Sequence, residues 1–505
     1  MRIGHNLVAG LGGSLWTAAV GLAVIPFYVR YLGVEGYGLI GFLATAQAVI
    51  QVFDFGLATT VNREIARATE SGDLAQARSL LHTFAAIYWV VAGVIAAAIA
   101  LLSPVVAAHW LHGDSLADDS LTGAVILMSL VIACRWPGQL YQGALMGAQR
   151  IVISSALNVA WVTLGSGGAV FVLAFVSPSV EAFLLWQAGV GLAYALAARA
   201  ISWKVLGRER VRYDPQQLAR IWRFSAGVGG VAVVGIVLSQ IDKLVLSKIL
   251  GLSEYGLYML AVAIAGTLYL FSTPFLNVVF PRFSVLVRSG DTVRLADAYR
   301  VSTRLLGAII FPVAMLFSVF SKDLVQVWTG DPMLALSVGS LLPMLAIGTA
   351  LHGVMHVPYA LQLAYGTTRL QLTICAVLLV AVVPLTIALA FAYGALGGAV
   401  AWLVLHALYL ILGTWLTHRR LLKGLGPKWL ALDVGVPLAV STLVGLFAFY
   451  TPVGGDLGVY ARLGFGLALA VFAFALTIAV SPALRGAALR NAREWVYRSP
   501  QGRAT

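Results

Sequence analysis

Several basic side chains lie inside long apolar stretches of the sequence, where a charge is costly if the stretch crosses a membrane. Arg135 stands near the middle of one stretch, in VIACRWPGQLYQG, while Arg30, Lys243 and Lys248 stand nearer the ends of others. Such groups by default face an interior or an aqueous path, so these four are candidate binding groups for an anionic ligand. Alternatively, Arg30 and Lys248 extend to a membrane surface, and Arg135 makes a structural bond to a carboxylate or to carbonyl groups that Pro137 frees.

Two acidic residues occupy similar settings. Asp54 lies in FDFG, and Asp242 precedes Lys243 in QIDKLVLSK. Asp54 could pair with an arginine or carry a coupling proton or sodium ion, and a structural ion pair is an equal alternative for both carboxylates. Neighbours on a helix point about 100° apart, so one member of the Asp242–Lys243 pair can face a cavity while the other meets another helix.

No constellation for catalysis or metal binding stands out. His352 and His356 have the i, i+4 spacing of metal ligands, but no acidic partner of the HExxH type accompanies them, so a packed or cavity-lining pair is the favoured interpretation. Cys134 and Cys375 offer neither a CxxC site nor a disulfide framework. The sequence therefore predicts a protein that is not an enzyme, with no metal site and no resident cofactor.

The elements that position these residues are membrane helices. The chain has 505 residues, 60% of them hydrophobic and only 10% charged, and its mean hydropathy is +0.91. Long uninterrupted apolar runs are typical of helical spans rather than of a transmembrane barrel. The pattern predicts an all-α integral membrane protein with about fourteen spans, the first over 6–31 and the last over 460–481.

The distribution of charge predicts the orientation of these spans. Most of the 33 Lys and Arg residues fall in alternate connections and at the two ends, whereas the opposite connections, such as 108–123, are acidic or lack basic residues. Basic loops are typical of the cytoplasmic side, so both termini are expected there. The net charge of +13 then marks an anionic inner leaflet and not a nucleic-acid partner.

A repeated phrase predicts internal symmetry. RYLGVEGYGLIGF at 30–42 aligns without a gap with KILGLSEYGLYML at 248–260. An even number of spans separates the copies, so both have the same orientation, as in parallel transporter repeats. We therefore expect two pseudo-symmetric six-helix lobes, an N-terminal one at 1–206 and a C-terminal one at 223–420. A cytoplasmic interfacial helix at 207–222 would join them. Two further helices at 421–482 and a basic cytoplasmic tail at 483–505 would follow.

Two phrases carry a family resemblance. FDFGLATTVNRE and QIDKLVLSKILG, with the segments 32–67 and 220–258 around them, resemble the Wzx-like polysaccharide and O-antigen flippases, the polysaccharide transporter branch of the MOP superfamily. The resemblance implies a protein of the bacterial cytoplasmic (inner) membrane. Such a protein moves a polyprenyl-diphosphate-linked oligosaccharide from the cytoplasmic to the outer leaflet by alternating access, beside a polysaccharide polymerase and glycosyltransferases.

The charged residues fit such a substrate. A diphosphate-sugar head cannot cross hydrocarbon unaided, so the protein must supply a hydrated and preferably cationic cavity. We expect the spans that contain the two repeats to line it, with Arg30, Arg135, Lys243 and Lys248 receiving the anionic charge. Two alternatives remain: a MATE-like cation-coupled exporter, which needs a carboxylate-lined cavity, and a scaffold for glycan-assembly enzymes that transports nothing.

Overall fold

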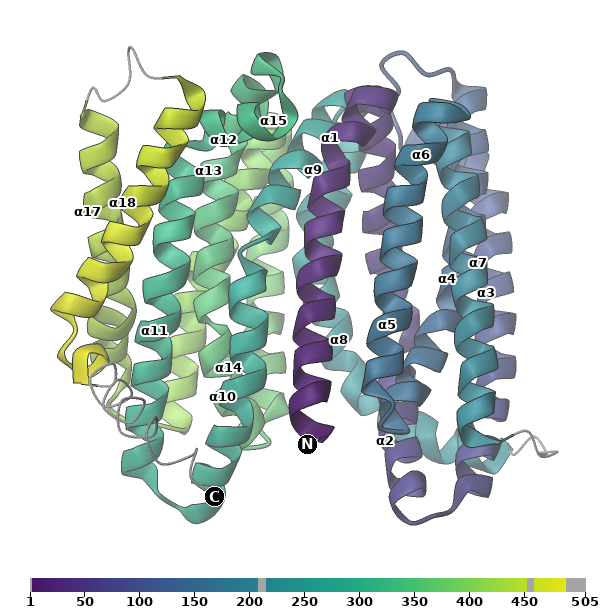
Figure 1. The fold of residues 1–505 in the computed structure, drawn as a ribbon, viewed down its shortest axis with the longest axis horizontal. Helices are drawn as coiled ribbons and strands as arrows, with labels where there is room; N and C mark the ends of the chain where they lie inside the picture. Colours follow the sequence, from purple (N-terminus) through teal and green to yellow (C-terminus); the bar gives the residue numbers. More distant parts are fainter. Residues whose placement is uncertain (1, 208–214, 452–457, 487–505) are drawn as a thin grey trace, which may run out of the picture. The chain divides into compact units, whose positions relative to one another are not determined.

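The chain folds into helices throughout the part that a computed structural model describes, residues 2–207, 215–451 and 458–486 (Figure 1). These residues form no β-strand, and only His112 and Gly251 pair in an isolated bridge. Of the predicted interfacial helix at 207–222, residues 208–214 lie outside the described residues, while 215–222 form the start of the longer helix α8 (Pro215–Ile249). Its interfacial position stays a prediction, and the basic tail at 483–505 lies outside the described residues from 487 onward. The prediction of an all-α protein is confirmed.

Membrane-spanning length and apolar composition characterise most of these helices. Helices can cross a bilayer because every backbone N–H and C=O finds its partner within the segment. Among the described residues, eleven segments are long and apolar enough to cross: Gly12–Asp54, Leu74–His109, Asp118–Gly147, Ile151–Phe175, Val180–Leu206, Tyr269–Ser289, Thr292–Val319, Pro332–Ala364, Thr368–Arg420, Gly426–Tyr450 and Val459–Val480. The protein is therefore a multi-pass membrane protein.

Two of the helices are longer than one crossing needs. α15 (Thr368–Arg420) has 53 residues, or about 80 Å at 1.5 Å per residue, against a hydrocarbon core of about 30 Å. Its backbone leaves the helical conformation at Gly394 (φ 56°, ψ −134°), and α1 (Arg2–Ile50) does so at Gly33 (φ 72°, ψ 175°). Each break divides its helix into two arms. The total of fourteen spans stays a prediction.

The first of two compact units comprises Met1–Met259 with Ala390–Ala395. Its central helix is α4 (Asp118–Gly147), which packs against α2 (Leu57–Glu70), α3 (Leu74–His109) and α7 (Val180–Leu206). This unit also contains α1, α5 (Ile151–Val162), α6 (Gly168–Phe175), α8 (Pro215–Ile249) and the start of α9 (Leu252–Gly266). α4 is buried along much of its length and so presents its side chains to the interior.

The two copies of the repeat pack against each other inside this unit. A Cβ atom at Gly38 would overlap the carbonyl oxygen of Leu252, and one at Gly256 would overlap that of Val34. These overlaps are equivalent under the sequence alignment, because Gly38 aligns with Gly256 and Val34 with Leu252. Both copies keep glycine because only a residue without Cβ allows this backbone approach.

The second unit comprises Leu260–Leu389 with Leu396–Thr505. It contains α10 (Tyr269–Ser289), α11 (Thr292–Val319), α12 (Ser321–Thr329), α13 (Pro332–Val354), α14 (His356–Ala364), most of α15, α17 (Gly435–Tyr450) and α18 (Val459–Val480). α17 and α18 pack on each other and on α11. The units divide the chain near Met259, whereas the lobes divide it within 207–222, and the lobe assignment stays a prediction.

A buried carboxylate holds this second unit together at the start of α17. Asp433 is fully buried in the π-helical segment η3 (Trp429–Val434). It accepts hydrogen bonds from Arg300 Nε at 2.9 Å and from Arg304 Nε, both on α11. Buried charges persist when they are paired in this way, so the triad fixes η3 against α11.

Candidate functional site

Arg135 projects from α4 into the interior of the first unit, where its partners are neutral. Its Nη1 donates to Gln47 Oε1 at 3.1 Å, and its Nη2 donates to Gln187 Oε1 at 2.5 Å. Gly191 of α7 makes room, since a Cβ there would lie 2.9 Å from Arg135 Cγ. No carboxylate of the described chain lies within 4 Å of the guanidinium. Its positive charge is held in place by amides and is not cancelled.

Two cavities border this guanidinium. The larger has a volume of about 260 Å³ and the smaller about 110 Å³, and Arg135, Gln47 and Trp161 line both. Further polar lining comes from Tyr28, Ser166 and Gln187 in the larger cavity and from Gln51, Gln139 and Gln142 in the smaller. Amide and hydroxyl groups of this kind suit a hydrated or sugar-bearing ligand, because they can both donate and accept hydrogen bonds.

An irregular helix forms one wall of the larger cavity. The segment Thr163–Gly167, between α5 and α6, is π-helical, and π-turns often occur at functional sites. Carbonyl oxygens of this segment accept side-chain hydrogen bonds: Ser166 O from Tyr28 Oη at 2.9 Å, and Leu164 O from Trp186 Nε1 at 3.0 Å. These bonds tie α1 and α7 to the irregular turn and so fix the wall.

An aromatic face covers the guanidinium. The Trp161 ring centroid lies 5.4 Å from Arg135 Cζ, within the range of a cation–π contact. Trp161 in turn stacks on Tyr194 with centroids 4.8 Å apart. The guanidinium Nε and Gln47 Nε2 are buried and have no hydrogen-bond partner among the described residues. Two N–H donors of the site, Arg135 Nε and Gln47 Nε2, are thus left for a ligand.

Asp54 lies at the break between α1 and α2. The 3₁₀ turn Gln51–Asp54 is followed by Phe55 and Gly56 with positive φ, and α2 begins at Leu57. One carboxylate oxygen of Asp54 accepts from Tyr88 Oη and the other from Ala58 N at 3.4 Å. No arginine or lysine of the described residues lies within 4 Å. The pairing with an arginine that we considered is not formed, and a coupling role stays a prediction.

Asp242 and Lys243 bind each other. Lys243 Nζ lies 3.1 Å from Asp242 Oδ1 and donates to Ser239 O at 2.9 Å, while Tyr258 Oη donates to Asp242. Both residues are buried, with 2% and 7% of their surface exposed. Although the Cα–Cβ bonds of neighbouring helix residues point about 100° apart, the two side chains bend toward each other and form an ion pair. A buried charge is stabilised by such a partner. Neither residue lines the cavities beside Arg135.

Arg30 and Lys248 lie about one helical turn before Gly33, where α1 breaks, and Gly251, which lies between α8 and α9. Arg30 is exposed and forms no ion pair within the described part of the chain. Lys248 is half-buried, and its Nζ lies 5.8 Å from the Trp110 ring centroid. Neither lines the cavities beside Arg135. The structure thus brings only Arg135 of the four predicted cations to these cavities, and a substrate role for the other three stays a prediction.

Sequence reasoning missed the amides at this site, and it interpreted the two histidines as a packed or cavity-lining pair. Gln47 and Gln187 are polar residues inside apolar segments, in TAQAV and LWQAG, and that isolation was the available signal. His352 packs in the second unit against His356 and Tyr269, and its Nδ1 lies 2.8 Å from Tyr269 Oη. Among the described residues, no group of three or more potential ligands is arranged to hold a metal ion.

Comparison with known proteins identifies solved structures with a similar fold and the family of the chain. A protein of Shigella flexneri named "Putative O-antigen transporter" is 22% identical over 423 residues, 83% of this chain and 98% of that protein. The solved structure of lipid II flippase MurJ in an inward closed conformation has a TM-score of 0.69 and 13% identity, and the match covers 93% of this chain and 97% of that one.

The solved structure of an inward-facing multidrug resistance MATE transporter of the MOP superfamily has a TM-score of 0.64 and 14% identity. The match covers 80% of this chain and 95% of that one. At such identities these structures establish the fold alone. The relatives are named as transporters or as a flippase and not as enzymes, which supports the prediction that this chain is not an enzyme. A family model described as polysaccharide biosynthesis protein matches residues 3–287, more than half of the sequence, and the chain belongs to that family.

Proposed function

We propose that this protein is a flippase for a polyprenyl-diphosphate-linked oligosaccharide. The observation that carries the proposal is the guanidinium of Arg135, which faces two polar cavities without a carboxylate to neutralise it. A cation inside a membrane protein is costly, so its charge is best explained by an anionic ligand. A diphosphate supplies that charge, and the amides around it can bind the attached sugar.

The family resemblance supports the direction of transport, and the relatives named as transporters support its place in a membrane. The substrate would be taken from the cytoplasmic leaflet of the bacterial inner membrane and released to the outer leaflet by alternating access, with both termini of the protein in the cytoplasm. A cavity of about 260 Å³ can hold only part of such a head group, and the diphosphate is the part whose charge it matches. The sugar therefore requires a wider opening during the cycle.

The remaining charged residues have secondary places in this proposal. Arg30, Lys243 and Lys248 would receive the head group at other stages of the cycle, and Asp54 is the candidate for a coupling proton or sodium ion. A polysaccharide polymerase and glycosyltransferases are the expected protein partners. The cation exporter finds no support at this site, since no Asp or Glu of the described chain lines the cavities beside Arg135.

Replacing Arg135 by alanine tests the role of the cation. We expect Arg135→Ala to abolish export of the surface polysaccharide in a host that lacks the native gene, while the protein remains in the membrane at its normal level. Arg199→Ala, a basic residue of α7 that does not line the cavities, is the control and should export normally. Normal export by Arg135→Ala would refute the proposal, and loss of the protein from the membrane would instead make Arg135 structural.

A further inference from the structure

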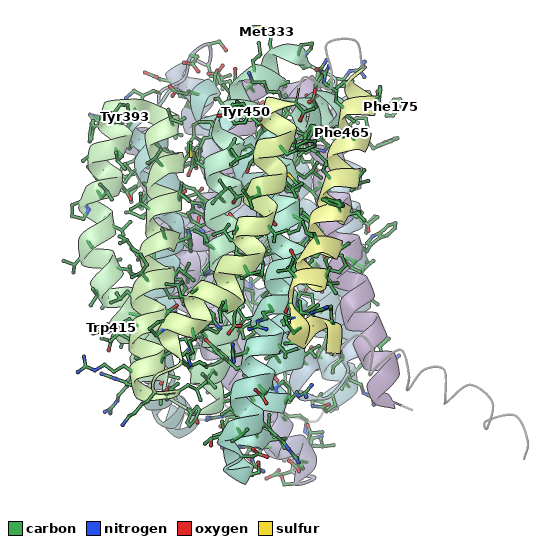
Figure 2. The ribbon with its side chains drawn as sticks, turned by 90° about the vertical axis from the view of Figure 1, so that its left-hand side faces the viewer. Phe175, Met333, Tyr393, Trp415, Tyr450 and Phe465 are labelled. Atoms are coloured by element: carbon green, nitrogen blue, oxygen red, sulfur yellow. The ribbon has the colours of Figure 1, made fainter. Side chains whose placement is uncertain are left out.

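A groove of about 950 Å³ lies within the second unit and shares no lining residue with the cavities beside Arg135. It is formed by α11, α12, α13, α17 and α18, and its volume is near the upper end of the range of about 300–1,000 Å³ for small-molecule sites. Figure 2 views this side of the unit, with α17 and α18 in front and Tyr450, which lines the groove, near one end of α17.

The groove has an apolar body and a polar end. Side chains such as Phe311, Met315 and Leu438 line the body, while Lys322, Asp323 and Arg462 gather at the end where α12 begins. An apolar groove between membrane helices suits lipid chains, because its walls offer water few hydrogen-bond partners. The polar end calls for an amphiphile, a molecule with a hydrophilic head and apolar tails.

The charges at the polar end favour an anionic head. Arg462 Nη2 lies 2.6 Å from Asp323 Oδ1, so these two charges cancel. Lys322 is exposed, and no carboxylate of the described residues pairs with it. Gly339 of α13 lets its stem pack closely, since a Cβ at Gly339 would lie 2.8 Å from Lys322 Cγ. One net positive charge therefore remains at the mouth of an apolar groove.

The length of the groove suits acyl chains. On α17 the lining runs from Leu438 to Tyr450, about 18 Å at 1.5 Å per residue, and on α13 it runs from Pro332 to Ala350, about 27 Å. These lengths lie within the hydrocarbon core of about 30 Å. The single net positive charge matches a phosphodiester, which carries one negative charge, better than a diphosphate, which carries two.

We propose that the groove is a binding site for one glycerophospholipid with an anionic head group, whose phosphate contacts Lys322 and whose acyl chains lie between α11 and α17. The occupant is a lipid of the surrounding bilayer and not the transported substrate. Lipid bound here seals the opening between α17 and the helices beside it. The proposal does not depend on the function assigned to the Arg135 site.

Photo-crosslinking can locate the acyl chains. The full-length protein is placed in phosphatidylcholine vesicles that contain a little phosphatidylglycerol with a photoactivatable acyl chain, and labelled peptides are mapped by mass spectrometry. We expect labelling to concentrate in 311–319 and 438–450. Thr442→Trp, which fills the groove from an exposed lining position, should remove that concentration, whereas Leu443→Trp, at the neighbouring exposed position that does not line the groove, should not.

A second pair of variants tests the head group. Lys322→Gln should weaken labelling by the phosphatidylglycerol probe about fivefold, the factor for about 1 kcal/mol from one cation near an anionic surface, and should leave labelling by a phosphatidylcholine probe unchanged. Lys423→Gln, at another exposed cation, should change neither.

Three results would overturn the proposal: labelling spread evenly over all helices, equal labelling of Thr442→Trp and the native protein, or displacement of the probe by polyprenyl phosphate more readily than by phosphatidylglycerol. Because labelling is measured without transport, failure here leaves the proposed flippase function standing. Conversely, a protein that binds the lipid as expected but exports no glycan would leave this site intact.

Discussion

Arg135 owes its chemical character to the side chains that hold it. Gln47 and Gln187 orient the guanidinium through their amide oxygens, yet neither removes its charge. A carboxylate in either place would form an ion pair and leave no net charge for a ligand. The choice of amides therefore distinguishes a binding cation from a structural one.

Gln187→Glu tests this distinction at nearly constant side-chain size. The new carboxylate would lie next to Arg135 Nη2, and we expect the initial transport rate to fall about tenfold or more, since 1.4 kcal/mol of lost interaction already corresponds to a factor of ten. The rate is to be measured with reconstituted vesicles and a labelled lipid-linked oligosaccharide. Gln326→Glu, on α12, is the control. Unchanged transport by Gln187→Glu would show that the charge of Arg135 is not used.

The arginines on α11 show the opposite case, a structural charge cluster. Asp433 is fully buried between Arg300 and Arg304, so Asp433→Asn would leave two arginines without their buried partner. We expect a loss of about 3–5 kcal/mol of folding free energy, measured as a lower thermal unfolding midpoint in detergent. Asp291→Asn removes an exposed i, i+3 pair with Arg294 and should cost less than about 1 kcal/mol. Equal midpoints for the two variants would contradict this account.

At the scale of the elements, the two copies of the repeated sequence, 30–42 and 248–260, pack against each other. Gly38 and Gly256 bring the start of α9 against the second arm of α1, and each glycine contacts the carbonyl of the partner copy. The repeat was visible in the sequence, but the contact was not, because an alignment of two copies does not say that they touch. Only the structure shows that Gly38 and Gly256 each face a backbone carbonyl of the other copy.

Alanine at these glycines should be poorly tolerated. A Cβ at Gly38 or Gly256 would overlap a carbonyl oxygen that cannot move independently, and overpacking of this kind costs about 1–3 kcal/mol. We expect Gly38→Ala and Gly256→Ala each to lower the thermal unfolding midpoint. Gly93→Ala, on α3, meets no atom within 4 Å and should leave the midpoint unchanged or slightly raised. A midpoint for Gly38→Ala equal to that of Gly93→Ala would disprove the contact.

At the scale of the whole molecule, membrane class and family were predictable, whereas the local partners were not. Apolar run length defines helical spans because the bilayer leaves no other way to satisfy the backbone, and the phrases around Asp54 and Asp242 indicated the family. The pairing of Asp242 with Lys243 and the amides around Arg135 arise from side-chain rotamers and from helices distant in sequence. Periodicity does not contain that information.

The positions of the predicted cations illustrate this limit. The sequence singled out Arg30, Arg135, Lys243 and Lys248 by the same criterion, a charge in an apolar stretch. In the structure, they have different surroundings: one faces cavities, one is paired, one lies over a tryptophan and one is exposed. The cost of a buried charge identifies candidates, but only the neighbours of each show how that cost is met.

The most direct test of the proposed function is to delete the gene in its host and to analyse the lipid-linked oligosaccharides together with the surface glycan. The flippase account predicts that one surface polysaccharide is lost and that its diphosphate-linked repeat unit accumulates on the cytoplasmic side of the inner membrane. A plasmid copy should restore export, and the Arg135→Ala copy should not. An intact surface glycan with no accumulated lipid-linked unit would contradict the account.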